Sequence, residues 1–337
     1  MAIRVGVVGL GVRGRQWVQA IRATSGYELV ACVDLNAETL QQGANELGIP
    51  THQCYSRLED ALDQARPQAV VVATSIDRHV DPCQAALECG LGVLVEKPFA
   101  LSLREARRLV AMAERAKAPL LVGQNYRYTR MPRAVRRLLA DGVLGQVGMV
   151  TCQSYRGPMD KTTASLSLPS CILWEHSVHH IDALRYVLGQ EVIAVMTQSF
   201  TLPWSPPLST GASVQVLFAF EGRARASYCA TVDSRGHEFF ERGQEFYLRL
   251  VGERGTVHVF HRWIVLCEQG KYPRLVRRGP REHPEEITLL RQLEHALLTG
   301  EEPECSGRDN LNTLAVLEAC ARSAAEQRWV KVEGANP

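Results

Sequence analysis

A glycine-rich loop between an expected strand and an expected helix restricts the fold of this chain more than any other feature. An apolar run over residues 3–8 leads directly into Gly9-Leu10-Gly11-Val12-Arg13-Gly14, and a helical pattern follows. In this setting, Gly-x-Gly-x-x-Gly predicts a dinucleotide-binding loop. The first glycine permits a tight turn, the second lets the backbone approach a pyrophosphate, and the third lets the helix pack closely on the strand. Free N–H groups at the helix start would bind the anion.

The residue that follows the second expected strand indicates which dinucleotide is bound. This strand, expected at residues 29–33, ends at Asp34, twenty residues past Gly14. A carboxylate there can accept hydrogen bonds from an adenosine ribose and would repel a 2′-phosphate, so NAD is favoured over NADP. NADP is not excluded, because Arg13 and Arg15 lie close enough in sequence to receive a phosphate. The alternative interpretation is an ordinary glycine turn followed by a solvated aspartate.

The order of the expected elements divides the chain into two parts. Up to residue 122, short apolar strands alternate with helical stretches of roughly 10 to 15 residues, which predicts βαβ units and a parallel sheet. After Gly123, strands of period two dominate, as in an open antiparallel sheet. We expect an α/β Rossmann domain with a doubly wound parallel sheet over residues 1–123, and an α+β domain with a large, mostly antiparallel open sheet over residues 124–337. The last helix is a candidate to pack back on the Rossmann domain.

The expected strands lie at residues 3–8, 29–33, 70–72, 93–95 and 120–122 in the first part, and at 149–155, 193–200, 214–220, 223–231, 245–251 and 256–260 in the second. Long helices are expected at residues 37–47, 103–116, 175–188, 284–298 and 310–326. A two-residue hairpin turn is expected at Glu221-Gly222, and a slightly longer one at residues 253–255. The irregular segment 156–173 is typical of loops that cover sites. The charged segment 233–245 is compatible with a subunit contact, a lid or a solvated loop.

Composition narrows the class of partner and the compartment. The formal net charge is +2 and no block of like charges appears, so nucleic acid and an acidic membrane are not favoured partners. No run approaches the roughly 18 apolar residues of a membrane span, and no signal-peptide pattern opens the chain. Ten cysteines are scattered without a Cys-x-x-Cys pair, which favours reduced core thiols over a disulfide or metal framework. We expect a soluble, cytoplasmic protein.

Two short stretches carry the residues from which chemistry is expected. The apolar run 93–95 stops at Glu96-Lys97-Pro98, at the carboxyl end of a strand, where open α/β sheets bind ligands. In a later expected helix, Glu175 and His179 stand one turn apart, and a carboxylate in that position can hold a histidine ring in one tautomer. A histidine titrates near neutral pH and can therefore act as a general base. His179 is the candidate base.

Three motifs in this order resemble the glucose-fructose oxidoreductase / inositol dehydrogenase (Gfo/Idh/MocA) family: the glycine loop, Glu96-Lys97-Pro98, and the stretch from Glu175 to Asp182. The likeness covers nearly the whole chain. It implies transfer of a hydride between NAD or NADP and a carbinol or carbonyl of a sugar, inositol or related polyol. It also implies a dimer or tetramer that pairs through the second sheet, and a cis peptide between Lys97 and Pro98.

The resemblance further implies roles for individual residues. Lys97 matches the active-site lysine, and Glu96 lies beside the nicotinamide ribose. His179 matches the acid/base histidine, and Glu175 stands where the family commonly has an aspartate. The candidate cofactor residues are Gly9, Leu10, Gly11, Val12, Arg13, Gly14, Asp34, Thr74, His79, Glu96, Lys97 and Asn125. The candidate substrate contacts are Lys97, Tyr126, Tyr155, Arg156, Trp174, His179 and His180.

The same residues also allow structural interpretations. Glu175 is also explained as a carboxylate in the first turn of a helix, where the helix dipole favours it. His179 is also explained as a hydrogen-bonded histidine of the core, and Lys97 as a cation that only positions the cofactor. His176 and His180 stand at i and i+4, but no Glu follows His176 as in a zinc hydrolase, so no metal site is predicted. The alternatives to a dehydrogenase are a non-redox enzyme that uses NAD transiently, as in glycoside cleavage, and a catalytically silent NAD-binding protein.

Overall fold

The computed structural model describes residues 2–157, 170–205, 211–235, 247–260, 263–279 and 283–334. Residues 158–169 and 236–246, which make up much of the two expected loops, lie outside the described residues. The chain divides into two compact units. The first comprises residues 1–125 and 283–311, and the second comprises residues 126–282 and 312–337.

This division adds to the first unit a stretch, residues 283–311, that the sequence analysis assigned to the second domain. The stretch contains helix α8 (Glu285–Thr299), and its Leu289, Leu290 and Leu293 are fully buried. Helix α8 packs against α1 (Val12–Ala23) and β5 (Gly92–Val95). The sequence pattern did not show which core the helix joins, because an apolar stripe fits any apolar face of suitable shape.

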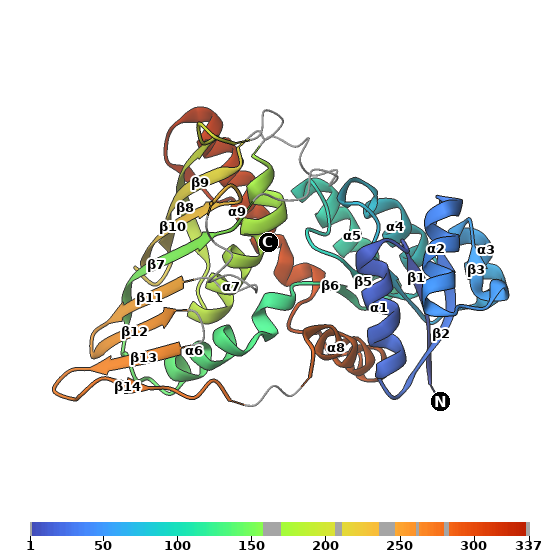
Figure 1. The fold of residues 1–337 in the computed structure, drawn as a ribbon, viewed down its shortest axis with the longest axis horizontal. Helices are drawn as coiled ribbons and strands as arrows, with labels where there is room; N and C mark the ends of the chain where they lie inside the picture. Colours follow the sequence, from blue (N-terminus) through green and yellow to red (C-terminus); the bar gives the residue numbers. More distant parts are fainter. Residues whose placement is uncertain are drawn as a thin grey trace. The chain divides into compact units, whose positions relative to one another are not determined.

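The first unit is built on a six-stranded parallel sheet with the strand order β3-β2-β1-β4-β5-β6 (Figure 1). Its other strands are β1 (Ile3–Val8), β2 (Tyr27–Val33), β3 (Cys54–Tyr55), β4 (Ala69–Val72) and β6 (Leu120–Val122). Its other helices are α2 (Ala37–Leu47), α3 (Leu58–Ala65), α4 (Val80–Glu88) and α5 (Leu103–Ala116), with short 3-10 turns η1 (Thr51–Gln53) and η2 (Ile76–Arg78). The expected α/β architecture is confirmed.

The strands of this sheet are apolar along their length because the sheet is covered on both faces. Every residue of β4 and β5 is buried. The strand order turns around at β1, since β2 lies on one side of it and β4 on the other. In open α/β sheets, ligands bind outside the carboxyl ends of the strands at such a switch point. The glycine loop begins there.

The second unit contains a nine-stranded sheet with the order β14-β13-β12-β11-β7-β10-β9-β8-β15. Its strands are β7 (Val147–Tyr155), β8 (Val192–Phe200), β9 (Ser213–Phe220), β10 (Arg225–Thr231), β11 (Tyr247–Gly252), β12 (Gly255–Phe260), β13 (Trp263–Glu268), β14 (Arg274–Leu275) and β15 (Val330–Lys331). The described strand pairs are antiparallel, apart from β10 with β7. The expected mostly antiparallel sheet is confirmed.

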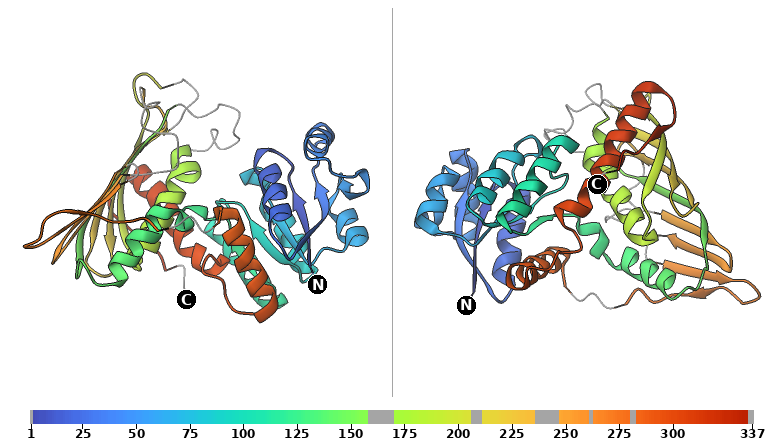
Figure 2. Two further views of the ribbon diagram at one scale, coloured as in Figure 1. Left: turned by 60° about the horizontal axis from the view of Figure 1, so that its bottom comes forward. Right: turned by 180° about the vertical axis from the view of Figure 1, so that it is seen from behind.

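Helices cover one face of this sheet. Figure 2 shows α6 (Arg130–Ala140) and α7 (Val178–Leu188) along that face. Residues that point toward the helices, such as Phe218 and Tyr228, are buried, whereas the intervening Leu217 and Val251 are exposed. This alternation follows from the period of two along a strand. Helix α9 (Gly307–Glu326) starts among the residues of the first unit and continues in the second.

Three local features differ from the expectations. A π-helical turn, η5 (Leu173–Ser177), precedes α7, so the helix expected from residue 175 is not α-helical throughout. The connection after Phe220 turns at Glu221-Gly222, as predicted, since the N of Arg223 donates to the carbonyl of Phe220 at 3.2 Å, but Arg223 adds a third residue before Phe220 pairs with Ala224. The connection after β11 is only Glu253-Arg254, because Gly255 already pairs with Gly252. Among the described residues, no helix has the length and apolar character needed to cross a membrane.

Candidate active site

The glycine loop has the shape that the sequence pattern requires. Gly9 has φ +91°, and a Cβ on Gly14 would stand 1.8 Å from the carbonyl oxygen of Gly9, so neither position accommodates a side chain. Above Gly11, no described atom lies within 4 Å of the position that a Cβ would take. Helix α1 starts at Val12, and its first turn contains no acidic residue. The loop therefore combines free space, helix N–H groups and a favourable dipole, and it fits a pyrophosphate.

Asp34 closes the loop on the side of the second strand. Its Oδ2 accepts a hydrogen bond from the backbone N of Leu10 at 2.8 Å, and its Oδ1 accepts one from the N of Asn36 at 2.9 Å. The carboxylate is therefore fixed where an adenosine ribose is expected. Arg15, which the sequence left open as a phosphate ligand, instead pairs with Glu46 at 3.1 Å. This pairing favours NAD over NADP.

Glu96 lies at the carboxyl end of β5 and is held by side chains of α1. Its Oε1 accepts hydrogen bonds from Arg13 Nε at 2.9 Å and Trp17 Nε1 at 2.8 Å. Arg13 also contacts Glu286 at 3.2 Å. Burial alone would raise the pKa of Glu96, but the charges of Arg13 and Lys97 and the two side-chain donors outweigh it and lower the pKa. Arg13, expected at the cofactor, is thus committed to Glu96 and Glu286.

Lys97 follows Glu96 and is half-buried. Its backbone N donates to Glu96 Oε2 at 3.3 Å, and the peptide between Lys97 and Pro98 is cis, as expected. Strand β5 lies two strands from β1 in the sheet, a separation of about 10 Å at the usual strand spacing. Because both strands run in the same direction, Lys97 and the glycine loop leave the same edge of the sheet.

The other candidate cofactor residues of the first unit lie along that edge. His79 is 2 % exposed, and its ring bridges the carbonyl oxygens of Pro98, at 2.9 Å, and Thr74, at 3.2 Å. Burial lowers the pKa of His79, although both carbonyl contacts oppose this shift. His79 therefore connects the loop after β4 with the segment after β5. Asn125 is buried, and its Oδ1 has no hydrogen-bond partner among the residues that the structure describes.

In the second unit, Tyr126 and His179 face each other. Their rings are stacked, with centroids 4.1 Å apart and planes inclined by 18°. Tyr126 is 2 % exposed and His179 is 9 % exposed. Tyr126 belongs to the turn η3 (Asn125–Tyr128), and His179 belongs to the first turn of α7. The stacking holds the imidazole in one plane while leaving a small part of it accessible.

His180, expected to contact substrate, is placed in an interior polar network. Its Nδ1 lies 2.7 Å from the hydroxyl of Tyr228, and its ring meets that of His176 edge-on at 4.6 Å. His176 Nε2 in turn lies 2.9 Å from Ser154 Oγ. Burial lowers the pKa of His180 to about 3, so its ring is neutral at pH 7. This environment is that of a structural histidine.

Asp182, in the same helix, is the centre of a buried charge cluster. Arg127 binds it through two hydrogen bonds of 2.6 Å, and Thr313 Oγ1 donates to it at 3.0 Å. Arg185 lies 3.8 Å from Asp182 and pairs with Glu191 at 2.6 and 2.7 Å. Two cations therefore balance two anions. Since Arg127 follows Tyr126, the cluster also fixes the ring that stacks on His179.

Two further candidates, Tyr155 and Arg156, lie at the end of β7 and are exposed. The positive charge of Arg156 adds to the burial that lowers the pKa of His180, and it opposes the burial that raises the pKa of Tyr126. Its guanidinium is therefore within electrostatic range of both rings. This position suits a residue that meets a polar ligand beside His179.

Trp174 and Glu175 both lie in η5. Trp174 is 8 % exposed, and Glu175 is half-buried. A π-helical turn widens the backbone spiral, and such turns are frequent at functional sites. The sequence did not reveal this turn, because the apolar pattern of residues 173–184 is compatible with a regular helix.

The Asp182 cluster and the polar network around His180 contain residues that were not among the site residues predicted from the sequence. Asp182 and Arg185 stand among the apolar residues of a helix that is buried along most of its length, and an ionised side chain in such a place requires a partner. Ser154 occupies an inward position of β7, after the buried Val150 and Cys152. These signals predict buried polar contacts, but they do not identify the partner. In the described part of the chain, no group of three or more potential metal ligands gathers.

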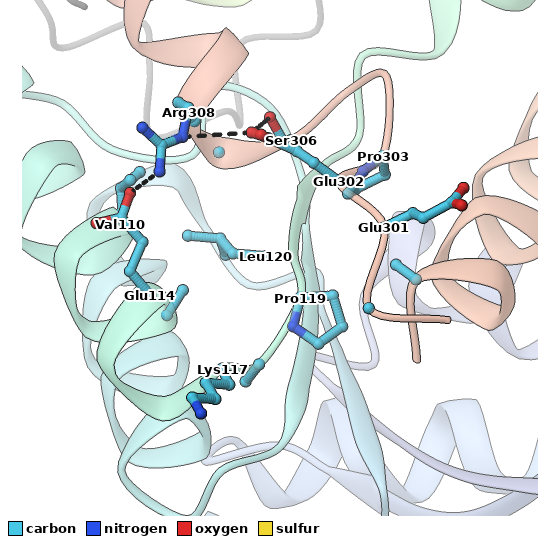
Figure 3. A pocket seen from close by; sticks show the side chains of 15 residues that line it. Val110, Glu114, Lys117, Pro119, Leu120, Glu301, Glu302, Pro303, Ser306 and Arg308 are labelled. Atoms are coloured by element: carbon cyan, nitrogen blue, oxygen red, sulfur yellow. Dashed lines mark hydrogen bonds and ion pairs between the residues drawn. The ribbon is translucent and has the colours of Figure 1, made fainter. Parts of the chain in front are cut away.

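A hollow of about 440 Å³ lies elsewhere in the first unit. It is bounded by the end of α5, the start of β6 and the connection from α8 to α9, and Figure 3 shows Arg308 between Glu114 and Glu302 at its rim. The start of β6 is at the edge of the parallel sheet opposite to Lys97. None of the candidate site residues lines this hollow.

Comparison with protein-family models matches both parts of the chain to one family. Residues 3–124 match the model of an oxidoreductase family with an NAD-binding Rossmann fold, GFO_IDH_MocA. Residues 133–258 match the model of the GFO/IDH/MocA C-terminal domain. Together, the two matches include the glycine loop, Lys97 and His179.

Individual relatives are similar over nearly the whole length. D-apiose dehydrogenase of Paraburkholderia graminis is 27% identical over 97% of this chain and 89% of its own. Inositol 2-dehydrogenase of Rhizobium meliloti is 26% identical over 98% of this chain and 100% of its own. An oxidoreductase of Agrobacterium radiobacter, solved with NAD+, L-tartaric acid and magnesium, shares the fold with a TM-score of 0.89 and 21% identity, covering 98% of this chain and 99% of that one.

Proposed function

Because the chain belongs to the GFO/IDH/MocA family of NAD-binding oxidoreductases, we propose that it transfers a hydride between NAD and a carbinol or carbonyl of a sugar, inositol or related polyol. The observation that carries the proposal is the arrangement of the first unit. A glycine loop with free space over Gly11 and the lysine after β5 leave the same edge of the parallel sheet. Relatives named as D-apiose and inositol dehydrogenases support the substrate class.

Within this proposal, the first unit binds the cofactor and stabilises the reacting oxygen. NAD, when bound, supplies the hydride acceptor. The loop of residues 9–14 would hold the pyrophosphate, Asp34 the adenosine ribose, and Asn125 Oδ1 a further hydroxyl. The ammonium of Lys97 would donate a hydrogen bond to the substrate oxygen and stabilise its developing negative charge.

The second unit would supply the base. His179 would take the hydroxyl proton, a contribution of roughly 10² to 10⁴ in rate for general-base catalysis. The stacked ring of Tyr126 supports this role, since it limits how the imidazole turns. Glu175, one turn earlier, would favour the tautomer that presents the basic nitrogen to the substrate.

The proposal is tested by incubating the purified protein with NAD+ and a panel of sugars and polyols while NADH absorbance is followed. We expect turnover with at least one neutral polyhydroxy compound. Replacement Lys97→Ala should abolish most turnover while leaving NADH binding largely intact, because the lysine acts on the substrate oxygen. Lys271→Ala removes an exposed lysine in a surface ion pair with Glu268 and serves as the matched control.

Two results would contradict the proposal. Cofactor binding without turnover on any compound would indicate a silent NAD-binding protein. Release of a product from a glycoside without net NADH would indicate the non-redox use of NAD.

We also propose that a second copy of the chain covers the outer face of the nine-stranded sheet. The large apolar residues Met149, Leu217, Val251, Phe260 and Trp263 are 40 to 59% exposed on described strands of this sheet. Apolar patches of this kind are typical of protein interfaces. Light scattering should give a dimer or tetramer for the natural protein and a smaller species for Leu217→Asp; a monomeric natural protein would refute the proposal.

A further inference from the structure

Asp233 lies at an edge of the second unit that already carries candidate substrate residues. Strands β7 and β10 are parallel neighbours, and Tyr155 is paired with Thr231 where the two strands end. Beyond these ends, the backbone N of Arg156 donates to the carbonyl of Thr231 at 2.9 Å, and the N of Ser234 donates to the carbonyl of Arg156 at 2.8 Å. Asp233 is thus held beside Arg156 by backbone hydrogen bonds.

The side chain of Asp233 is buried although its carboxylate is incompletely satisfied. The residue is 4 % exposed. Its backbone N donates to Thr231 Oγ1 at 3.1 Å, and its carbonyl accepts from Trp204 Nε1 at 3.0 Å, so the main chain is fixed on both sides. Among the described residues, its Oδ2 has no hydrogen-bond partner. A charged acceptor that is buried without a donor destabilises the fold, so Oδ2 has the capacity to accept a hydrogen bond from a bound ligand.

The segment of residues 211–212 connects the neighbourhood of Asp233 with Cys171, which lies just before the π-helical turn. The backbone N of Val232 donates to the carbonyl of Ala212 at 3.1 Å, and the thiol of Cys171 contacts the carbonyl of Gly211 at 4.0 Å. Burial raises the pKa of Cys171, and the negative charges of Glu175 and Asp233 raise it further. Both carboxylates are therefore within electrostatic range of one thiol.

We propose that Asp233 binds a hydroxyl group of the substrate and selects neutral polyols over sugar acids. An ionised carboxylate only accepts hydrogen bonds, and a polyol hydroxyl supplies the donor that Oδ2 lacks. The negative charge of Asp233 would also repel an anionic substituent placed against Oδ2. This inference rests on the proposed function and specifies the substrate class for the same site.

The inference is tested with Asp233→Asn and, as the matched control, Asp63→Asn, which alters an exposed aspartate of α3. Turnover is measured with myo-inositol and D-glucose as neutral probes and D-glucuronate as the anionic one. Because a neutral amide replaces the charged acceptor, Asp233→Asn should raise KM for the neutral probe by about tenfold with a smaller change in kcat. The preference for D-glucose over D-glucuronate should fall by at least tenfold, since repulsion of the anion is also removed.

A melting curve without substrate separates a ligand-binding carboxylate from a structural one. Asp233→Asn removes a buried charge whose Oδ2 has no hydrogen-bond partner among the described residues, so its melting temperature should equal or exceed that of the natural protein. An unchanged KM and an unchanged preference would overturn the inference while leaving the proposed function intact. If the natural protein oxidises none of these three probes, the wider panel of sugars and polyols decides the proposed function, and the melting curve still decides the role of Asp233. A lower melting temperature for Asp233→Asn would then overturn it.

Discussion

Glu96 and Asp182 are both buried carboxylates paired with arginine, one in each unit, but their surroundings differ. The arginines beside Asp182 have side chains that are 3% exposed, whereas the Arg13 side chain beside Glu96 is 36% exposed. Arg13 also belongs to the glycine loop, and Glu96 precedes Lys97. The Asp182 cluster therefore fixes the helix that carries His179, whereas the Glu96 pair connects the glycine loop to the end of β5 and remains in contact with solvent.

The largest loss of stability is expected when the Asp182 cluster is broken. Arg127→Ala removes two of the described hydrogen bonds to Asp182 and leaves one arginine, Arg185, for the two anions Asp182 and Glu191. Removing one partner of a buried ion pair costs roughly 3 to 5 kcal/mol of unfolding free energy. Urea unfolding measures this loss. Arg322→Ala, which breaks an exposed pair with Glu333, is the control and should cost less than about 1 kcal/mol. Equal losses of unfolding free energy in the two variants would show that the buried Asp182 cluster stabilises the fold no more than an exposed ion pair does.

Breaking the pair of Glu96 and Arg13 should lower the free energy of unfolding by a smaller amount. Glu96→Ala removes an acceptor from Arg13 and Trp17, but Arg13 keeps Glu286 and partial access to water. We expect a loss of about 2 kcal/mol in unfolding free energy and a weaker affinity for NADH, because the loop is no longer tied to β5. Fluorescence titration of NADH measures the second effect. A stability loss as large as that of Arg127→Ala would contradict the contrast between the two carboxylates.

The two units should also respond differently to acid. His180 has a pKa of about 3 in the folded protein and about 6.5 when unfolded. Between these values the unfolded chain binds more protons, so stability falls as the pH is lowered from 6.5, by up to about 2 kcal/mol at pH 5. The pKa of Glu96 is lowered by folding, so its contribution persists above about pH 4.3 and is lost only below that value.

His180→Gln removes this titration while keeping a polar side chain beside Tyr228. Unfolding free energies measured from pH 7 to pH 5 should therefore depend less on pH in the variant than in the natural protein. A parallel pH dependence in both proteins would mean that His180 is not held neutral by the fold.

The smallest effect is expected on the preference for NAD over NADP, and it tests whether Arg13 stays bound to Glu96. Asp34→Ala removes the carboxylate that disfavours a 2′-phosphate, but Arg13 and Arg15 remain engaged with glutamates. The ratio of NAD to NADP affinity should fall about tenfold, or ~1.4 kcal/mol, without a reversal of preference. Titration with both reduced cofactors checks this. A strong preference for NADP would show that an arginine leaves its glutamate once the aspartate is gone.

The expected elements followed from local patterns, and most were found where the patterns placed them. The glycine loop, the apolar strand before Glu96 and the helix that carries His179 each have a period or composition that determines their type within a few residues. The patterns did not predict β13, β14 and β15, nor the π-helical turn before α7. Two-residue strands such as β14 and β15 contain too few residues for a period to be recognised.

The sequence by itself determined the Rossmann unit and the strands of the open antiparallel sheet, because these depend on short-range order. The family followed from the resemblance of three motifs, which contain Gly9, Lys97 and His179. Only the tertiary structure decided which charges meet. Arg13 and Glu96 are 83 residues apart in the chain, and Arg127 and Asp182 are 55 apart. Near each motif, several arginines and acidic residues could have formed such an ion pair, and neither their residue type nor their spacing in the sequence distinguished among them. The choice among them depends on packing of distant elements, and this is also why Asp233 became a candidate only once its burial was seen.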